Sequence, residues 1–336
     1  MHKKTLILTL LLLLFTPFDY IIFLRWLDGM KNYEWLASSV IYPLIHIPYF
    51  LAGTLYYNKL FIKEVSQKKL MIIGMSDGLN ALLISLAAPN ISILLISILN
   101  RLTIPLVQLL SFIFLDRRYK KNHYLGVHLT LIAVLVSFIP VFDKSETTKI
   151  SGLLIYLSSL IPNVTSYILK EKWIQKKTNE WSMNLWIAIW QSIFGLLLFP
   201  VVFWTSYLSF FTYIKNGLTC QFLDRNINPN DNCNYNLLFM LLYQFISCSI
   251  NILQLLIIKS ESSTLYNIIY TVKVPIQIIL SSFKSIGGEA YSKLNWYSVL
   301  SFILIIISTI VYTYKDEIKL NNLNEMDEPL LDINVN

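Results

Sequence analysis

The sequence predicts an all-α integral membrane protein in which ten transmembrane helices form two inverted five-helix repeats. Three observations support this fold class. The 336-residue chain is 55% hydrophobic and only 14% charged, whereas about one quarter of the residues in soluble domains are charged. Its apolar residues come in runs of roughly 20, the length that crosses a bilayer. A proline motif also recurs five runs apart, as a duplication would produce.

Ten runs qualify as membrane spans because each is long, apolar and poor in charge. In chain order they cover residues 6–27, 36–58, 69–88, 91–115, 123–142, 150–172, 183–208, 235–258, 264–284 and 295–314. The first run follows two lysines, as the apolar part of a signal peptide would. It lacks a small-residue cleavage site and continues past Pro17, so we expect it to remain as a span.

The connections between the spans are short, and Pro89-Asn90 is the shortest, so successive helices are expected to be antiparallel. Only the connection 209–234 is long. We therefore expect a single transmembrane domain over residues 1–315, with repeat one at about 1–145 and repeat two at about 146–315. The tail 316–336 is polar and acidic, a composition typical of disordered segments.

The placement of lysine and arginine predicts that both termini are cytosolic, because cytoplasmic loops accumulate these residues. With both ends inside, the inner segments hold 17 of the 27 basic residues and the outer segments hold 8. The remaining two, Arg101 and Lys273, fall inside spans. The net charge of +7 is spread over short loops without a basic stripe, so we expect no nucleic-acid partner.

The proline motif links span four to span nine. Span four contains RLTIPLVQ, starting at Arg101, and span nine contains YTVKVPIQII, starting at Tyr270. Repeats with an odd number of helices insert with opposite topology, and the substrate site of such transporters lies at the midplane. Pro105 and Pro275 would each free a backbone carbonyl and shape a cavity wall. Two ordinary proline kinks are the alternative explanation.

Four charged residues within spans are candidate site residues, because charge inside a membrane is costly and usually faces a cavity or an opposite charge. Asp77, near the middle of span three, is expected to bind a cationic substrate group or to carry a coupled proton; alternatively, it pairs with Arg101 and only orients two helices. Arg101 cannot shed its proton, so it either neutralises Asp77 or presents its guanidinium to an anionic group of the cargo. Lys273 would complete a pseudo-symmetric carboxylate site with Arg101. Asp19 lies toward the outer side, as a cavity residue or simply hydrated.

Nothing in the sequence indicates an enzyme. The HExxH motif, the nucleophile elbow and the glycine-rich phosphate loop are all absent from it. Its four histidines do not stand near acidic clusters at ligand spacing, and no CxxC or His-Cys metal pattern occurs. We therefore expect no cofactor and no metal. The expected partners are membrane lipids, a small-molecule substrate and protons, with the chain acting as a monomer.

Four further motifs stand out in the sequence: IKNGLTCQFLDRNINPNDNC at 214–233, IGMSDGLNALL at 73–83, RLTIPL through FLDRRYKKNHYLG at 101–126, and SSLIPN at 158–163. Together they resemble the chloroquine-resistance-transporter-like family of the drug/metabolite transporter superfamily. The resemblance implies ten helices in inverted repeats and proton-coupled export from an acidic vacuole or lysosome-like organelle to the cytosol. The implied cargo is amino acids, short peptides, glutathione-like thiols or weak-base drugs. A nucleotide-sugar or phosphorylated-metabolite exchanger and a passive channel are the alternatives.

The resemblance also assigns roles outside the spans' centres. It implies a disulfide between Cys220 and Cys233, with two free thiols as the alternative. Lys170 and Glu171 match a basic–acidic pair at the cytosolic mouth, or form a solvated helix end. Glu289 matches an outer-side acid that senses luminal pH, or is a surface carboxylate.

The sequence also departs from this family. The family's best-known member has four cysteines in the long loop, whereas this loop has two. That member has uncharged polar residues beside the two prolines, where this chain has Arg101 and Lys273. Two cations would change the charge of the cavity and with it the class of substrate.

Overall fold

The computed structural model is helical throughout the elements it describes. It describes residues 3–87, 90–91, 95–96, 99–142, 150–174, 176–198, 210–228, 231–260, 263, 266–267, 270, 280, 283 and 296–313. No strand occurs in these ranges. The longer helices are α1 (Lys3–Gly29), α2 (Tyr42–Tyr56), α3 (Gln67–Ala87), α5 (Thr103–Leu115), α6 (Lys121–Phe142), α7 (Ile150–Trp173), α8 (Glu180–Leu197), α10 (Phe210–Leu223), α11 (Asn236–Ser260) and α15 (Trp296–Thr313). The short elements are the 3₁₀ turns η1 (Lys31–Tyr33) and η4 (Asn100–Leu102) and the π-helix η2 (Leu36–Ile41).

Five helices within the described ranges are long and apolar enough to cross a membrane. They cover Ile7–Gly29, Leu36–Tyr56, Gln67–Ala87, Ile150–Trp173 and Asn236–Ser260. Their outer surface agrees with this, because Leu14, Leu154 and Leu241 are each more than half exposed, as lipid-facing side chains are. The chain is thus an all-helical membrane protein. Most of the predicted span 264–284 lies outside the described residues, as do the predicted tail and residues 199–208 of span seven.

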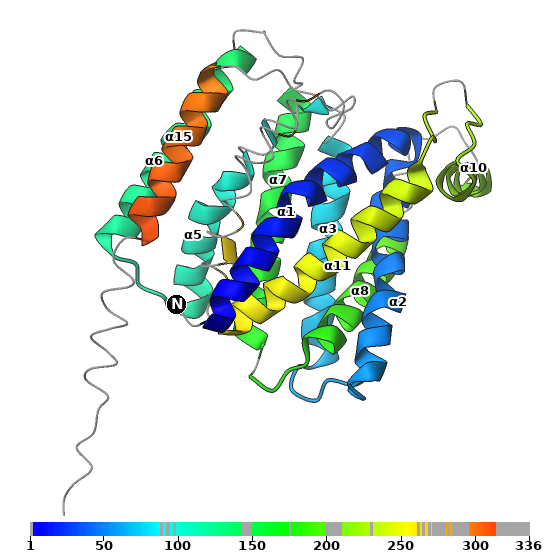
Figure 1. The fold of residues 1–336 in the computed structure, drawn as a ribbon, viewed down its shortest axis with the longest axis horizontal. Helices are drawn as coiled ribbons and strands as arrows, with labels where there is room; N and C mark the ends of the chain where they lie inside the picture. The colour runs from blue at the N-terminus through cyan, green and yellow to red at the C-terminus, as the bar shows by residue number, and fades with distance from the viewer. Residues whose placement is uncertain are drawn as a thin grey trace, which may run out of the picture.

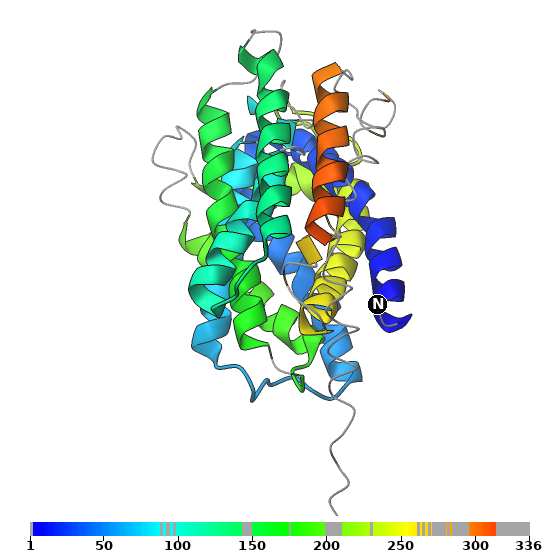
Figure 2. The same ribbon diagram turned by 90° about the vertical axis from the view of Figure 1, so that its left-hand side faces the viewer.

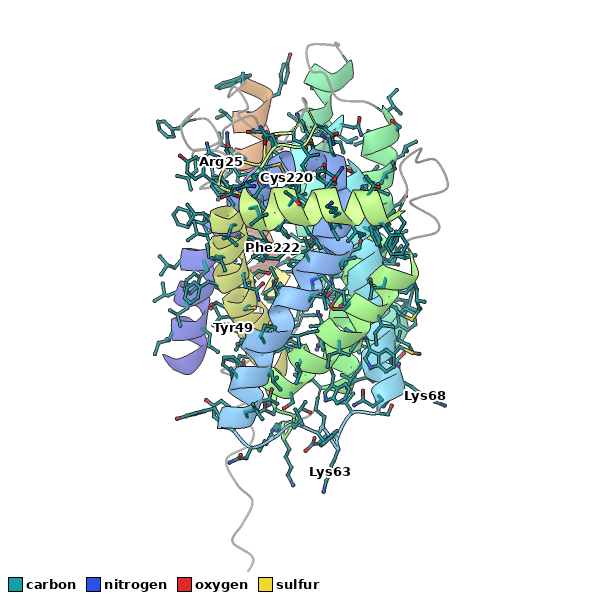
Figure 3. All side chains as sticks on the ribbon, turned by 90° about the vertical axis from the view of Figure 1, so that its right-hand side faces the viewer. Arg25, Tyr49, Lys63, Lys68, Cys220 and Phe222 are labelled. Carbon is teal, nitrogen blue, oxygen red and sulfur yellow. A yellow bond between two sulfur atoms is a disulfide. The ribbon has the colours of Figure 1, made fainter. Side chains whose placement is uncertain are left out.

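The helices form a bundle with one pair at its edge (Figures 1 and 2). In the bundle α1 packs against α11, α3 packs between α7 and α8, and α2 packs against α8. At the edge, α6 packs along α15. Helix α10 lies across one end of the bundle, close to perpendicular to the other helices (Figure 3).

Local sequence explains where several helices begin and end. Asn179 caps α8, since its side-chain oxygen accepts a hydrogen bond from the Ser182 N–H at 3.0 Å. Asp116 ends α5 in the left-handed conformation, with φ of 51°, which aspartate tolerates better than most residues. Gly195 lets α8 approach η2 so closely that a Cβ there would collide with the Ser39 carbonyl.

Helix α10 occupies half of the connection 209–234, which the sequence analysis describes only as a long loop. Its buried residues Tyr213, Gly217, Cys220 and Gln221 fall on one face at helical spacing. This face packs near η1, where a side chain at Gly217 would meet Tyr33. The apolar and polar pattern of one helical face is therefore present in the sequence, within the segment predicted as a loop.

The segment after α10 is held by the carboxylate of Asp231. This carboxylate accepts hydrogen bonds from the Asn32 amide at 2.6 Å, the Tyr33 hydroxyl at 3.2 Å, and the backbone N–H groups of Ile227 and Asn228 at 3.1 and 2.9 Å. Burial opposes ionisation of Asp231, but these donors hold its pKa below the ordinary value. Burial and the charge of Asp231 in turn raise the pKa of Tyr33 to about 12. The connection is thus tied to the end of the bundle.

Candidate functional site

A cavity of about 200 Å³ lies inside the bundle; we name it the central cavity. Its walls come from α1, α2, α3, α7, α8 and α11, together with residues near η4 and after α11. Much of the lining is polar: it includes Asp19, Tyr42, His46, Asp77, Asn80, Asn100, Tyr156, Asn163, Tyr167, Lys170, Asn184, Gln191, Tyr243, Ser247, Asn251, Gln254, Tyr266 and Tyr270. A polar interior inside an apolar exterior suits a protein that handles a polar solute within a membrane.

An ion pair between neighbouring helices lies at the wall of this cavity. The Nζ atom of Lys170 on α7 is 2.9 Å from Oδ2 of Asp77 on α3. Side-chain exposure is 5% for Lys170 and 19% for Asp77. The same Nζ atom lies 5.9 Å from the ring centroid of Tyr167, within the range of a cation–π interaction. The cavity therefore holds a fixed negative and positive charge that neutralise each other.

Glu171, the residue next to Lys170, faces different partners. Its carboxylate pairs with the Arg117 guanidinium, and it also accepts hydrogen bonds from the backbone N–H of Ser263, at 3.0 Å, and from the Ser263 hydroxyl. Glu171 thus ties the end of α7 to the segment after α5 and to the segment after α11. Lys170 therefore lies in the cavity wall, whereas Glu171 lies where α7, the segment after α5 and the segment after α11 meet.

A histidine of α2 takes part in a further polar cluster that the sequence analysis did not single out. His46 is buried; its Nδ1 lies 2.5 Å from the Tyr42 carbonyl and its Nε2 lies 3.3 Å from the Ser247 hydroxyl. The Tyr42 and Ser247 hydroxyl groups are 3.3 Å apart. Tyr42 and His46 are four residues apart, a spacing that places two polar residues of an apolar span on one face. That spacing was the available signal.

Arg101, in η4, is buried with an exposure of 2%. Two of its guanidinium nitrogens, Nε and Nη2, have no hydrogen-bond partner. Among the described residues, the ion pair of Asp77 is formed with Lys170 and not with Arg101. Tyr156 and Tyr270 lie close enough to Arg101 to interact with it electrostatically, and both line the central cavity.

The other predicted site residues divide into two groups. Asp19 lines the central cavity together with Asp77. Pro105 is the third residue of α5, and without an N–H it cannot bond to the carbonyl of Arg101 four residues earlier. Lys273, Pro275 and Glu289 lie outside the described residues.

The two cysteines of the long connection lie at bonding distance. The Cys220 and Cys233 sulfur atoms are 2.10 Å apart, and both residues are buried. A search for metal ligands gives no result in the part of the chain that the structure describes: it contains no group of three or more histidine, cysteine, aspartate or glutamate residues that could hold an ion.

Comparison with known proteins gives a consistent result. A family model described as CRT-like, chloroquine-resistance transporter-like, matches residues 5–312. The chain is 25% identical to Crt homolog 1 of Dictyostelium discoideum over 91% of this chain and 74% of the relative. It is 26% identical to a putative chloroquine resistance transporter of Plasmodium yoelii yoelii, over 86% of this chain and 74% of the relative. It is 24% identical to the chloroquine resistance transporter of Plasmodium falciparum (isolate 7G8), over 86% and 73%.

Proposed function

The chain belongs to the chloroquine-resistance transporter-like family, and we propose that it is a proton-coupled secondary transporter of small polar solutes. It moves amino acids, short peptides, glutathione-like thiols or weak-base drugs from the lumen of an acidic organelle to the cytosol. Both termini face the cytosol. Membership of a transporter family fits a carrier rather than an enzyme.

The observation that carries this proposal is the Asp77–Lys170 ion pair at the wall of the central cavity. Asp77 comes from the predicted first repeat and Lys170 from the second, so the pair joins the two predicted halves at the wall of the cavity. Ionisable residues within membranes are typical of proton and substrate pathways. Protonation of Asp77 removes the attraction that holds Lys170 to α3. The same carboxylate can then couple a proton to a movement of one half against the other.

The helix contacts support two related halves. If the predicted spans are numbered in order, α1 and α11 are spans one and eight, and α3 and α7 are spans three and six. In a five-plus-five duplication, each span of one half corresponds to the span five places away in the other half. This correspondence converts the contact of spans one and eight into the contact of spans six and three, and both contacts occur. The contacts of α3 with α8 and of α11 with α2 are related in the same way, and the contacts of α2 with α8 and of α6 with α15 map onto themselves. This pattern is expected from inverted repeats.

The two ends of the bundle support the predicted orientation. Lys63 and Lys68, predicted on the cytosolic side, lie at the end opposite Cys220 (Figure 3). On the luminal side a bond between Cys220 and Cys233 would persist, because disulfides are maintained in oxidising compartments. Their sulfur atoms lie at bonding distance, and we include this disulfide in the proposal.

The test is uptake into proteoliposomes that contain the purified full chain, with and without an imposed pH gradient. Cationic, neutral and anionic short peptides serve as substrates. Asp77→Asn is expected to abolish stimulation by the pH gradient, because its amide cannot exchange a proton. Asp116→Asn is the matched control: it makes the same chemical change at an exposed helix end. If Asp77→Asn keeps full stimulation, proton coupling does not run through this pair.

Counterflow separates the carrier from the alternatives. A carrier is accelerated by substrate on the opposite side of the membrane, and a passive channel is not. Acceleration by nucleotide sugars or phosphorylated metabolites, with none by peptides or amino acids, would favour the exchanger instead.

A further inference from the structure

We propose that Arg101 forms an anion-binding subsite beside the central cavity and that it binds a carboxylate group of the transported solute. This inference rests on the transporter function proposed above. It goes beyond that function because it names the chemical group the solute must carry and the residue that recognises it.

The first step is that Arg101 is a buried charge without a counter-charge among the residues that the structure describes. It is 2% exposed, and its Nε and Nη2 atoms have no hydrogen-bond partner. Arginine stays protonated in proteins, so it cannot escape the cost of burial by becoming neutral. Buried charges in folded proteins are normally paired. Arg101 is therefore an energetically costly residue whose partner has to come from elsewhere.

The second step is that the acids near this region interact with other groups. Asp19, which lines the cavity, interacts electrostatically with Tyr270 and forms no ion pair with Arg101 within the described residues. Asp77 pairs with Lys170 at 2.9 Å, and Glu171 pairs with Arg117 and Ser263. Within the described residues, neither Asp77 nor Glu171 forms an ion pair with Arg101. In the described part of the chain, Lys170 has a carboxylate partner in the cavity wall and Arg101 has none.

The third step is the position of Arg101 beside the cavity. The preceding residue, Asn100, lines the central cavity. Tyr156 and Tyr270, the two residues that interact electrostatically with Arg101, also line it. The Tyr156 hydroxyl donates to the Ile96 carbonyl at 3.4 Å, which leaves its oxygen free to accept a hydrogen bond. The guanidinium thus lies beside a wall made of phenol and amide groups, which suit a polar solute.

The fourth step is the choice of anion. One unpaired positive charge is neutralised by one negative charge, which a carboxylate supplies and a phosphate dianion exceeds. A guanidinium also offers parallel N–H donors that match the two oxygens of a carboxylate. Arg101 leaves a pair of buried donors, Nε and Nη2, available for this arrangement. A carboxylate-bearing solute is therefore the class that the wall fits.

The main experiment compares alanyl-alanine with its C-terminal amide in proteoliposomes of the full chain, and adds glucose 6-phosphate as a phosphate probe. Wild type is expected to take up the free acid at least about 10-fold better than the amide, the factor expected for a hydrogen bond to a charged group. Arg101→Gln should bring the acid and the amide to equal rates. Arg101→Lys should retain part of the preference, because lysine keeps the positive charge but lacks the parallel N–H donors of the guanidinium.

Three outcomes would overturn the subsite. The first is no preference for the acid in wild type, the second is a full preference in Arg101→Gln, and the third is uptake of glucose 6-phosphate above that of alanyl-alanine. If no variant transports any probe, the proposed function fails, and the subsite is then decided by binding alone. In that case the purified wild type should still be stabilised against heat by alanyl-alanine more than by the amide, and Arg101→Gln should not.

A second measurement asks whether Arg101 is only a structural residue. Without solute, Arg101→Gln is expected to unfold at the same temperature as wild type or above it, because it removes an unpaired buried charge. Lys170→Gln is the matched comparison, since it removes a buried cation that has a partner, and its unfolding temperature should fall. If both variants unfold at lower temperature to the same extent, Arg101 has a protein partner and the proposal is wrong.

Discussion

The Asp77–Lys170 pair allows a quantitative prediction about stability. At the observed separation of 2.9 Å, the attraction of two unit charges is about 6 kcal/mol for an effective dielectric constant of about 20. Most of this is offset by the cost of taking both charges out of water. Replacing one partner leaves the other charge buried and unpaired, so Lys170→Gln or Asp77→Asn alone should each cost about 3–5 kcal/mol. Replacing both should cost much less than the sum.

A double-mutant cycle measures this difference directly. The free energy of unfolding is determined in detergent for wild type, Asp77→Asn, Lys170→Gln and the double variant, and we expect a coupling energy of at least about 2 kcal/mol. Asp116→Asn, at an exposed helix end, should change stability by no more than about 0.5 kcal/mol. Additive effects of the two single variants would refute the reasoning, because they would mean that the two side chains do not stabilise each other.

Three other perturbations have calculable effects. Replacing both Cys220 and Cys233 with serine should lower the free energy of unfolding by ~3 kcal/mol, given their separation of 13 residues. In mass spectrometry the reduced protein should be heavier than the untreated protein by two hydrogen atoms, and identical masses would contradict the bond. Burial raises the pKa of Glu34 to about 7, so its ionisation costs stability progressively as the pH rises above about 4.5, and the cost is complete above pH 7. Glu34→Gln should therefore gain on the order of 2 kcal/mol over wild type between pH 5 and pH 8 in pH-dependent unfolding, and a constant difference would contradict this. Gly195→Ala places a Cβ against the Ser39 carbonyl and should destabilise by about 1–3 kcal/mol; an unchanged unfolding temperature would show that η2 can shift.

The sequence predicted several helices closely because bilayer thickness and hydropathy set their length. The predicted span 36–58 is the continuous helical stretch from Leu36 to Tyr56, and the predicted span 69–88 is α3, Gln67–Ala87. The observed ends of these helices differ from the predicted ends by about two residues, because caps and glycines rather than hydropathy determine where a helix begins and ends. Helix α10 was missed because it lies across the end of the bundle, where a segment of mixed polarity needs only one buried face. The arrangement in two inverted repeats stays a prediction.

The sequence indicates which charged residues of the site are costly to bury, but it does not indicate which of them pair with each other. Asp77 stands out in the sequence because a carboxylate in an apolar span needs a partner, and this holds without any structure. The cation that the sequence analysis considers as its partner is Arg101, but the partner is Lys170, 93 residues away. Contact between α3 and α7 depends on how the whole chain folds. Lys170 also lies near the end of a predicted span, a position that predicts a solvated residue rather than a cavity residue. His46 was missed for a related reason, because its four-residue spacing from Tyr42 is a signal of a shared helix face and not a motif of a known kind of site.

Lys170 in the cavity wall and Arg101 beside it therefore have different roles in the proposed transport cycle. Lys170 is bound to a carboxylate that can accept a proton, whereas Arg101 has no counter-charge among the described residues and cannot lose its own proton. A change at Asp77 should alter the response to a pH gradient and leave the preference between an acid and its amide. A change at Arg101 should alter that preference and leave the response to the gradient. If the cargo carboxylate instead displaced Lys170 from Asp77, either substitution would change both properties, so measuring both in both variants separates a two-site mechanism from a shared one.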